Sequence, residues 1–137
     1  MKLELRVDPQ NQWFVSVWVV LNGKKAIIEF KVDTGCNGGL VLSHKELKGL
    51  GYLTNHADFA NLPNETGTLA SGEKSIFKKL GAVSLYQVGK QPIHICNASA
   101  ICHVTHETNN LIGTEVLRQF RDINFRLYGN RYMDLLK

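Results

Sequence analysis

The first quarter of the chain alternates apolar and polar residues with a period of two, which is the pattern of β-strands. Residues 2–7 place leucine or valine at every second position and charged residues between them, so they predict a strand with one buried face. Residues 12–21 are rich in valine and tryptophan and predict a strand buried on both faces. Residues 25–32 predict its antiparallel partner, because Asn22 and Gly23 supply the positive φ angles of a tight hairpin turn.

The rest of the chain continues in short strands separated by turn residues. Further strands are predicted at residues 40–42, 68–70, 74–83, 83–88, 93–98, 100–104, 122–127 and 132–136. Two pairs of them, on either side of residues 71–72 and of residues 129–130, are expected to form hairpins. Two stretches without a clear period are predicted to be loops, namely residues 53–66 and 105–110.

Two short helices are expected between the strands. Ser43 has the side chain of a helix N-cap, Glu46 three residues later completes a capping box, and Gly51 lies near the expected end. Thr114 is expected to cap the second helix, over residues 115–119. The pattern as a whole predicts an all-β fold, a closed barrel with one or two short helices.

The composition agrees with one soluble globular domain, residues 1–137. Hydrophobic residues make up 44% and charged residues 20% of the chain, an ordinary globular balance. The longest apolar run, residues 13–21, is far short of the ~20 residues that span a bilayer, and the N-terminus lacks the apolar core of a signal peptide. Three cysteines are an odd number, which fits a reducing compartment. We therefore expect a cytoplasmic protein without membrane contact.

The net charge of +4 raises the alternative of a nucleic-acid-binding β-barrel. The basic residues are spread along the chain, however. The densest clusters, Lys24-Lys25 and Lys78-Lys79, are not interleaved in sequence with aromatic residues that would stack on bases. A solvated basic surface is the simpler interpretation, and we expect no nucleic-acid partner.

The residues with the clearest chemistry lie where the second strand of the first hairpin ends. Val32 is followed by Asp33, Thr34 and Gly35, so a carboxylate stands at the mouth of a glycine-rich turn. Packed strand residues fix its direction, and the glycine lets a substrate or another chain approach closely. The same tripeptide is common in ordinary turns, so a purely structural role is the alternative.

Residues 30–42, Phe-Lys-Val-Asp-Thr-Gly-Cys-Asn-Gly-Gly-Leu-Val-Leu, resemble the active-site segment of the retropepsin-like (retroviral-type) aspartic proteases, and most closely their bacterial and archaeal branch. Residues 110–117 resemble the family's second signature, two hydrophobic residues and a glycine that lead into a helix. Residues 70–72 lie between them, where the family has the tip of its flap, and residues 120–136 resemble its final helix-to-hairpin stretch. The resemblance covers nearly the whole chain, in the right order.

The resemblance implies a closed retropepsin-like barrel and an aspartic endopeptidase that works as a homodimer on an extended peptide or protein. Asp33 is the implied catalytic residue, contributed once by each subunit. The sequence agrees, because it contains no second Asp-Thr-Gly or Asp-Ser-Gly. Thr34, Gly35 and Cys36 would support the catalytic loop, with Thr34 hydrogen-bonded across the dimer axis. The near match at residues 65–67 does not follow an apolar strand and is interpreted as a loop leading into the flap.

Six further residues take supporting roles by the same resemblance. Three would pack behind the catalytic loop: Leu111, Ile112 and Gly113. Three would form the flap that closes over the substrate and hydrogen-bonds to its main chain: Ala70, Ser71 and Gly72. The resemblance implies no cofactor.

Cys36 departs from the family pattern, which usually has alanine or serine after the Asp-Thr-Gly. A thiol fits there but is a weaker hydrogen-bond donor than a hydroxyl, and a small buried filler is the simplest interpretation. The departure motivates an alternative function, a catalytically weak or inactive retropepsin-like domain that binds peptides or dimerises.

A second group of residues has the chemistry of zinc ligands, namely His94, Cys96, Cys102 and His103. His94 and Cys96 are expected to share a strand face, whereas Cys102 and His103 are expected to point to opposite faces. The spacing is not that of a zinc knuckle, so we expect ordinary strand packing and no metal.

Overall fold

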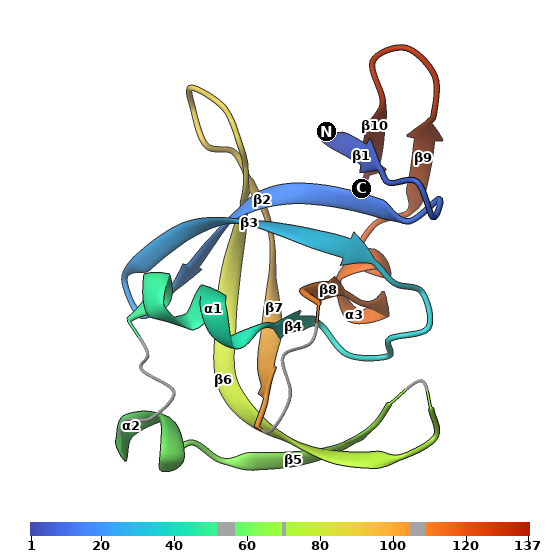
Figure 1. Cartoon of the computed structure of the whole chain (residues 1–137). Coiled ribbons are helices and arrows are strands. Elements are labelled where there is room, and N and C mark those ends of the chain that lie inside the picture. Colours follow the sequence, from blue (N-terminus) through green and yellow to red (C-terminus); the bar gives the residue numbers. More distant parts are fainter. Residues whose placement is uncertain (52–56, 70, 105–108) are drawn as a thin grey trace.

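The computed structural model describes residues 1–51, 57–69, 71–104 and 109–137. The predicted all-β fold with a few short helices is confirmed (Figure 1). The strands are β1 (Lys2–Val7), β2 (Trp13–Leu21), β3 (Lys24–Val32), β4 (Leu40–Leu42), β5 (Asn64–Thr68), β6 (Lys74–Gln87), β7 (His94–His103), β8 (Leu111–Ile112), β9 (Asp122–Arg126) and β10 (Tyr132–Leu136). The helices are α1 (His44–Leu47), α2 (Ala57–Ala60), α3 (Thr114–Leu117) and the 3-10 turn η1 (Lys48–Leu50).

The middle strands close into a ring. They hydrogen-bond in the order β6, β7, β4, β8, β3 and β2, and a further pairing between β2 and β6 completes the circle. The predicted closed barrel is therefore confirmed. β5 continues the sheet beyond β6, while β1, β10 and β9 continue it beyond β2.

The inside of the ring is the hydrophobic core. Its largest fully buried side chains are mostly aliphatic, with one phenylalanine, and they include Phe30, Ile28, Leu40, Leu42, Leu85, Ile95 and Ile112. Burying a side chain of this size stabilises the fold by roughly 1.5–3 kcal/mol. The strand that leads to Asp33 is thus anchored by some of the best-packed residues of the molecule.

β2 and β3 form the predicted hairpin. Leu21 pairs with Lys24, and the turn residues Asn22 and Gly23 have φ angles of 51° and 74°. Odd-numbered side chains from 15 to 21 are buried, whereas even-numbered ones are half-buried. The prediction that this strand is buried on both faces is therefore wrong, because no further layer covers its outer face completely.

The second hairpin begins earlier and runs longer than predicted. Residues 53–66 were expected to be loop, but α2 occupies 57–60 and β5 begins at residue 64, paired with the first half of β6. β6 is one strand of 14 residues instead of two, and β7 is likewise a single strand of 10 residues. β6 bends without ending, because Gly81 adopts a φ of 95° beside a register shift in its pairing with β7.

Neither predicted helix cap forms. Ser43 precedes α1, but its side chain makes no cap hydrogen bond. Glu46 does not reach back to it either, because its carboxylate accepts a hydrogen bond from the side chain of Asn110 (3.1 Å). α3 begins at Thr114 itself, with Gly113 in the cap position and no side-chain cap.

The two ends of the chain lie side by side (Figure 1). β9 and β10 form the predicted terminal hairpin, and β10 also pairs with β1. The N-terminal ammonium group donates to Asp134 Oδ1 (3.0 Å) and to the main-chain oxygen of Leu135 (2.9 Å). Within the described residues, no helix has the length and apolar character needed to cross a membrane.

Candidate active site

Asp33 opens a tight turn directly after β3. Its main-chain N–H donates to the oxygen of Ile112 (3.0 Å), which continues the parallel pairing of β3 with β8. Cys36 N–H donates to the Asp33 oxygen (3.2 Å) and closes the turn. Gly35 N–H donates to Asp33 Oδ1 (2.9 Å), so the turn itself orients the carboxylate. Asp33 is half-buried while Thr34 and Gly35 are exposed, and the carboxylate therefore stands next to open surface.

β8 lies between β3 and β4, behind this turn. Leu111 pairs with Lys31 and with Val41, and Ile112 pairs with Val32 and Leu40. Ile112 is buried and Leu111 is half-buried. These two predicted residues thus join the strand that enters the Asp33 turn to the strand that leaves it.

Gly113 touches the turn more closely than a side chain would permit. A Cβ at this position would lie 2.3 Å from the main-chain oxygen of Gly38 and 2.7 Å from that of Cys36. Gly113 N–H donates to the Gly39 oxygen (2.8 Å), and Thr114 N–H donates to the Cys36 oxygen (2.9 Å). The second signature and the Asp33 loop are therefore joined main chain to main chain.

Glu115, in the first turn of α3, holds the same loop in place, and it was not among the predicted site residues. Its two carboxylate oxygens accept hydrogen bonds from Ser99 N–H (2.9 Å) and Ser99 Oγ (2.7 Å). Gly39 lies directly beneath, since a Cβ there would be 2.3 Å from the Ser99 oxygen and 3.1 Å from Glu115 Oε2. The paired glycines after the Asp-Thr-Gly are the one sequence feature that pointed to such a close approach.

Asn110 is a second positioning residue that the sequence analysis missed. Its side chain accepts from Ser43 N–H (2.8 Å) and donates to the Glu29 oxygen (3.2 Å) and to Glu46 Oε1 (3.1 Å). Its main-chain oxygen accepts from Lys31 N–H (2.8 Å). One amide thus connects β3, α1 and the start of β8. An asparagine in a polar stretch looks like any loop residue in the sequence.

Cys36 fills the space between the turn and Gly113. A Cβ at Gly113 would lie 2.9 Å from the Cys36 sulfur, and the residue is half-buried. Burial raises the pKa of this thiol, the negative charge of Asp33 raises it further, and a backbone hydrogen bond at Gly38 acts in the opposite direction. The neutral thiol is therefore the form present beside the carboxylate.

The β5–β6 hairpin ends where the flap tip was predicted. Leu69 N–H donates to the Glu73 oxygen (2.8 Å), and Gly72, with a φ of 87°, donates to the Leu69 oxygen (2.9 Å). Ser71 and Gly72 therefore lie in the turn, while Ala70 falls outside the described residues. Residues 65–67, interpreted above as a loop, are part of β5, because their ladder to β6 continues without interruption. In the view of Figure 1 the hairpin tip and the Asp33 loop both lie on the right-hand side of the barrel.

The His and Cys residues of β7 do not gather as zinc ligands. Leu85 pairs with Cys96 but Tyr86 pairs with His94, so Ile95 is an extra residue that turns His94 outward while Cys96 is buried. The expectation that His94 and Cys96 share a face is therefore wrong. Among the described residues, no three His, Cys, Asp or Glu side chains are close enough to hold a metal ion.

His103, at the end of β7, is fully buried at the base of the β5–β6 hairpin. Its Nε2 is hydrogen-bonded to Ser75 Oγ (2.5 Å), and its ring meets that of Phe77 edge-on. Nε2 of His44 contacts the main-chain oxygen of His103. The histidine therefore ties the hairpin to α1 as well as to its own strand.

Comparison with known proteins finds a similarity of fold. No protein-family model matches the chain, and no curated protein matches it. Among solved structures, a retropepsin-like aspartic protease from Rickettsia conorii is similar, with a TM-score of 0.57 and 18% sequence identity over 97% of this chain and 87% of that one. The chain therefore has the retropepsin-like fold that the sequence resemblance implied.

Proposed function

We propose that the protein is an aspartic endopeptidase in which two copies of the chain each supply Asp33. The observation that carries the proposal is the oriented carboxylate, with Gly35 N–H on Asp33 Oδ1 (2.9 Å), in a barrel with the retropepsin-like fold. A catalytic acid must be held in a fixed direction and still reach its substrate. Asp33 meets both conditions, because its neighbours Thr34 and Gly35 are exposed.

The reaction needs two carboxylates in different protonation states. Across a two-fold axis the two Asp33 side chains would approach to about 3 Å, at which they share one proton because both cannot ionise. The ionised carboxylate takes a proton from a bound water, whose oxygen adds to the peptide carbonyl carbon. The protonated carboxylate hydrogen-bonds to the carbonyl oxygen. The C–N bond then breaks, and the amine leaves with a proton from the dyad.

The β5–β6 hairpin supports an extended peptide as substrate. β5 is an edge strand with mostly exposed residues, so one side of its main chain is available for pairing. An edge of this kind binds an extended chain through main-chain hydrogen bonds and needs few particular side chains. Ser71 and Gly72 at the tip of the hairpin have small side chains or none, which is compatible with a hairpin that closes over the bound peptide.

The decisive experiment is hydrolysis of an unstructured protein at mildly acidic pH, with Asp33→Asn as the inactive variant. The carboxamide is nearly the same size but neither ionises nor shares a proton. Asp122→Asn is the matched control, because it removes an exposed carboxylate at the start of β9. The proposal predicts full activity for Asp122→Asn and none above background for Asp33→Asn. Equal cleavage by the Asp33→Asn protein would show that this carboxylate is not the catalytic acid.

Mixing the parent with the Asp33→Asn protein tests whether two chains share one site. After equal amounts have exchanged subunits, about one quarter of the dimers carry two Asp33 residues. Activity is therefore expected to fall to about one quarter of that of the same total amount of parent. A fall to about one half would mean that each chain works alone.

The alternative function is an inactive domain that binds peptides or dimerises, and Cys36 at a position of the catalytic loop is the observation that favours it. A parent protein that sediments as a dimer and retains an extended peptide, yet cleaves nothing over a range of acidic pH, would support this alternative over the enzyme.

A further inference from the structure

The outer face of the barrel carries a row of side chains that the core does not use. Trp18 of β2 pairs with Ile27 of β3 on one side and with Tyr86 of β6 on the other. Tyr86 in turn pairs with His94 of β7, and the two rings meet edge-on at 5.2 Å. Trp18 and Tyr86 are half-buried, and Ile27 is 49% exposed. Aromatic and apolar surface thus runs across four neighbouring strands.

Polar groups border this row on one side. Val20 of β2 pairs with Lys25 and with Ser84, and Ser84 pairs with Asn97. Ser84 Oγ donates to Asn97 Oδ1 (2.9 Å), and the same oxygen is hydrogen-bonded to His94 Nε2 (3.0 Å). Amide, hydroxyl and imidazole groups therefore stand next to the aromatic rings, where they can contact the edge of a flat ligand that lies on those rings.

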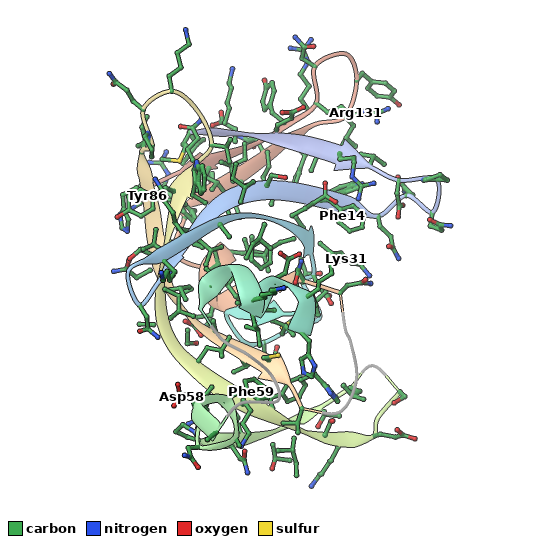
Figure 2. All side chains as sticks on the ribbon, turned by 60° about the vertical axis from the view of Figure 1, so that its left-hand side comes forward. Phe14, Lys31, Asp58, Phe59, Tyr86 and Arg131 are labelled. Carbon is green, nitrogen blue, oxygen red and sulfur yellow. The ribbon has the colours of Figure 1, made fainter. Side chains whose placement is uncertain are left out.

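Cations lie over two of the aromatic rings of this face. Lys25 Nζ lies 5.3 Å from the centre of the Trp18 ring. Nearer the Asp33 end, the guanidinium carbon of Arg6 lies 4.2 Å from the centre of the Phe14 ring. Phe14 pairs with Lys31 on its other side, and Figure 2 shows these two residues at neighbouring ends of β2 and β3, with Tyr86 farther along the molecule. Each outer aromatic residue of β2 therefore has a cation beside it.

The charge of the face is unbalanced. The outward positions of β2 and β3 between residues 14 and 31 include one carboxylate, Glu29. It is engaged by Arg6, whose Nε and Nη2 donate to its two oxygens (2.9 and 2.6 Å). Lys25 and Lys31 have no such partner among the ion pairs of the described residues. A ligand that carries regular negative charge would pair with them.

We propose that this face, made by Phe14, Trp18, Tyr86, Lys25 and Lys31, binds single-stranded nucleic acid. Bases would stack on Trp18 and Tyr86, and phosphates would pair with the two lysines, the combination that such ligands select. As a base stacked on the Trp18 ring, the Lys25 ammonium group would move from that ring to a phosphate. The positive charge of Lys25 would thus still contribute to binding. Polypeptides lack both the repeated negative charge and the repeated flat rings.

The stacking part of this face is separate from the proposed catalytic turn. Lys25, beside the Trp18 ring, precedes Asp33 by eight residues, which is roughly 25 Å along an extended chain. Lys31 is close to Asp33 in the chain, so the independence of binding from proteolysis is tested with Trp18, Tyr86 and Lys25. The sequence did not show this face because its aromatic residues and lysines become neighbours through strand pairing and not through adjacency in the chain.

The test is fluorescence anisotropy of a labelled oligo-dT and of a single-stranded RNA of the same length, titrated with the full chain at several salt concentrations. Each phosphate contact contributes about −0.7 to the slope of log K against log salt for a single strand. Lys25→Ala is expected to weaken binding and to lower the magnitude of that slope by about 0.7. Lys45→Ala is the matched control, because Lys45 is exposed on α1, which contributes no residue to this face, and should change neither quantity.

The stacking contribution is tested with Trp18→Ala and Tyr86→Ala, each expected to weaken binding about tenfold without changing the salt slope. Tyr128→Ala is their control, since Tyr128 is 85% exposed in the β9–β10 turn. Should Trp18→Ala fail to fold by circular dichroism, Trp18→Leu retains a larger apolar side chain and removes the ring, and the same loss is expected. Asp33→Asn should bind like the parent.

Three results would overturn the proposal. One is no detectable binding at low salt. Another is equal weakening by Tyr128→Ala and Trp18→Ala. The third is inorganic polyphosphate that competes as well as the oligonucleotide at equal charge, since the face would then attract charge alone.

Discussion

Replacing Gly113 with alanine tests whether the Asp33 turn is held by direct packing of main chain on main chain. The added methyl group would lie 2.3 Å from the Gly38 oxygen and 2.7 Å from the Cys36 oxygen. Neither oxygen can rotate away as a side chain would, so the loop itself must move. Overpacking costs about 1–3 kcal/mol. We expect about 3 kcal/mol here, because movement would also stretch the bond from Gly113 N–H to the Gly39 oxygen (2.8 Å).

Urea and thermal unfolding followed by circular dichroism measure this loss. For a chain of 137 residues, about 3 kcal/mol lowers the melting temperature by roughly 10 °C. Gly38→Ala is the matched control in the same loop: its Cβ would meet no atom within 4 Å, and its φ is not in the left-handed region. It should stay within about 1 kcal/mol of the parent. A Gly113→Ala protein as stable as the Gly38→Ala protein would refute the close approach.

Three further measurements follow from the structure. Asn110→Ala removes bonds to two other elements and should lower the free energy of unfolding in urea by about 2 kcal/mol; an unchanged midpoint would contradict its positioning role. Burial raises the pKa of Cys96 to about 11 and that of Cys102 to about 12. Thiols of the unfolded chain ionise at lower pH, so in reducing buffer the free energy of unfolding should fall above about pH 9, by about 1.4 kcal/mol per pH unit for each thiol. The Cys102→Val protein should show a shallower fall, and a fall as steep as that of the parent would contradict this reasoning. The hydrogen bond from Arg6 lowers the pKa of Glu29. The stabilisation of the fold by this ion pair is therefore present at neutral pH and is lost as the pH falls through the lowered pKa. In an NMR titration of the Arg6→Ala protein, the pKa of Glu29 should return toward its ordinary value.

Features that rest on neighbouring residues were predicted well from the sequence. The β2–β3 hairpin follows from two apolar runs joined by Asn22-Gly23, since few residues other than these adopt the required positive φ angles. The terminal hairpin was predicted for the same reason. The Asp33 turn was recognised because an apolar strand, a carboxylate and glycines occur together in one short segment.

Features that depend on pairing between distant segments were missed. The single extra residue Ile95 turns His94 away from the face on which Cys96 is buried, and no local pattern predicts a bulge of this kind. The hydrogen bonds from Ser99 to Glu115 connect a strand with a helix, and each residue taken alone is an ordinary polar side chain. The partly open outer face of β2 was likewise hidden, because a run of valine and tryptophan looks the same whether one face or both are covered.

The way in which Asp33 is held explains how the fold persists where few side chains are shared. The contacts that shape the turn join main-chain groups: Asp33 N–H to Ile112, Gly113 N–H to Gly39, and Thr114 N–H to Cys36. Such bonds are indifferent to side-chain identity, except where a Cβ would intrude, as at Gly39 and Gly113. A chain that keeps this turn therefore needs the aspartate, a few glycines and positioning side chains such as Asn110 and Glu115, and most other positions are free to vary. Whole-sequence likeness then fades sooner than the geometry, which is why the short segment around Asp33 carried more information than the rest of the chain.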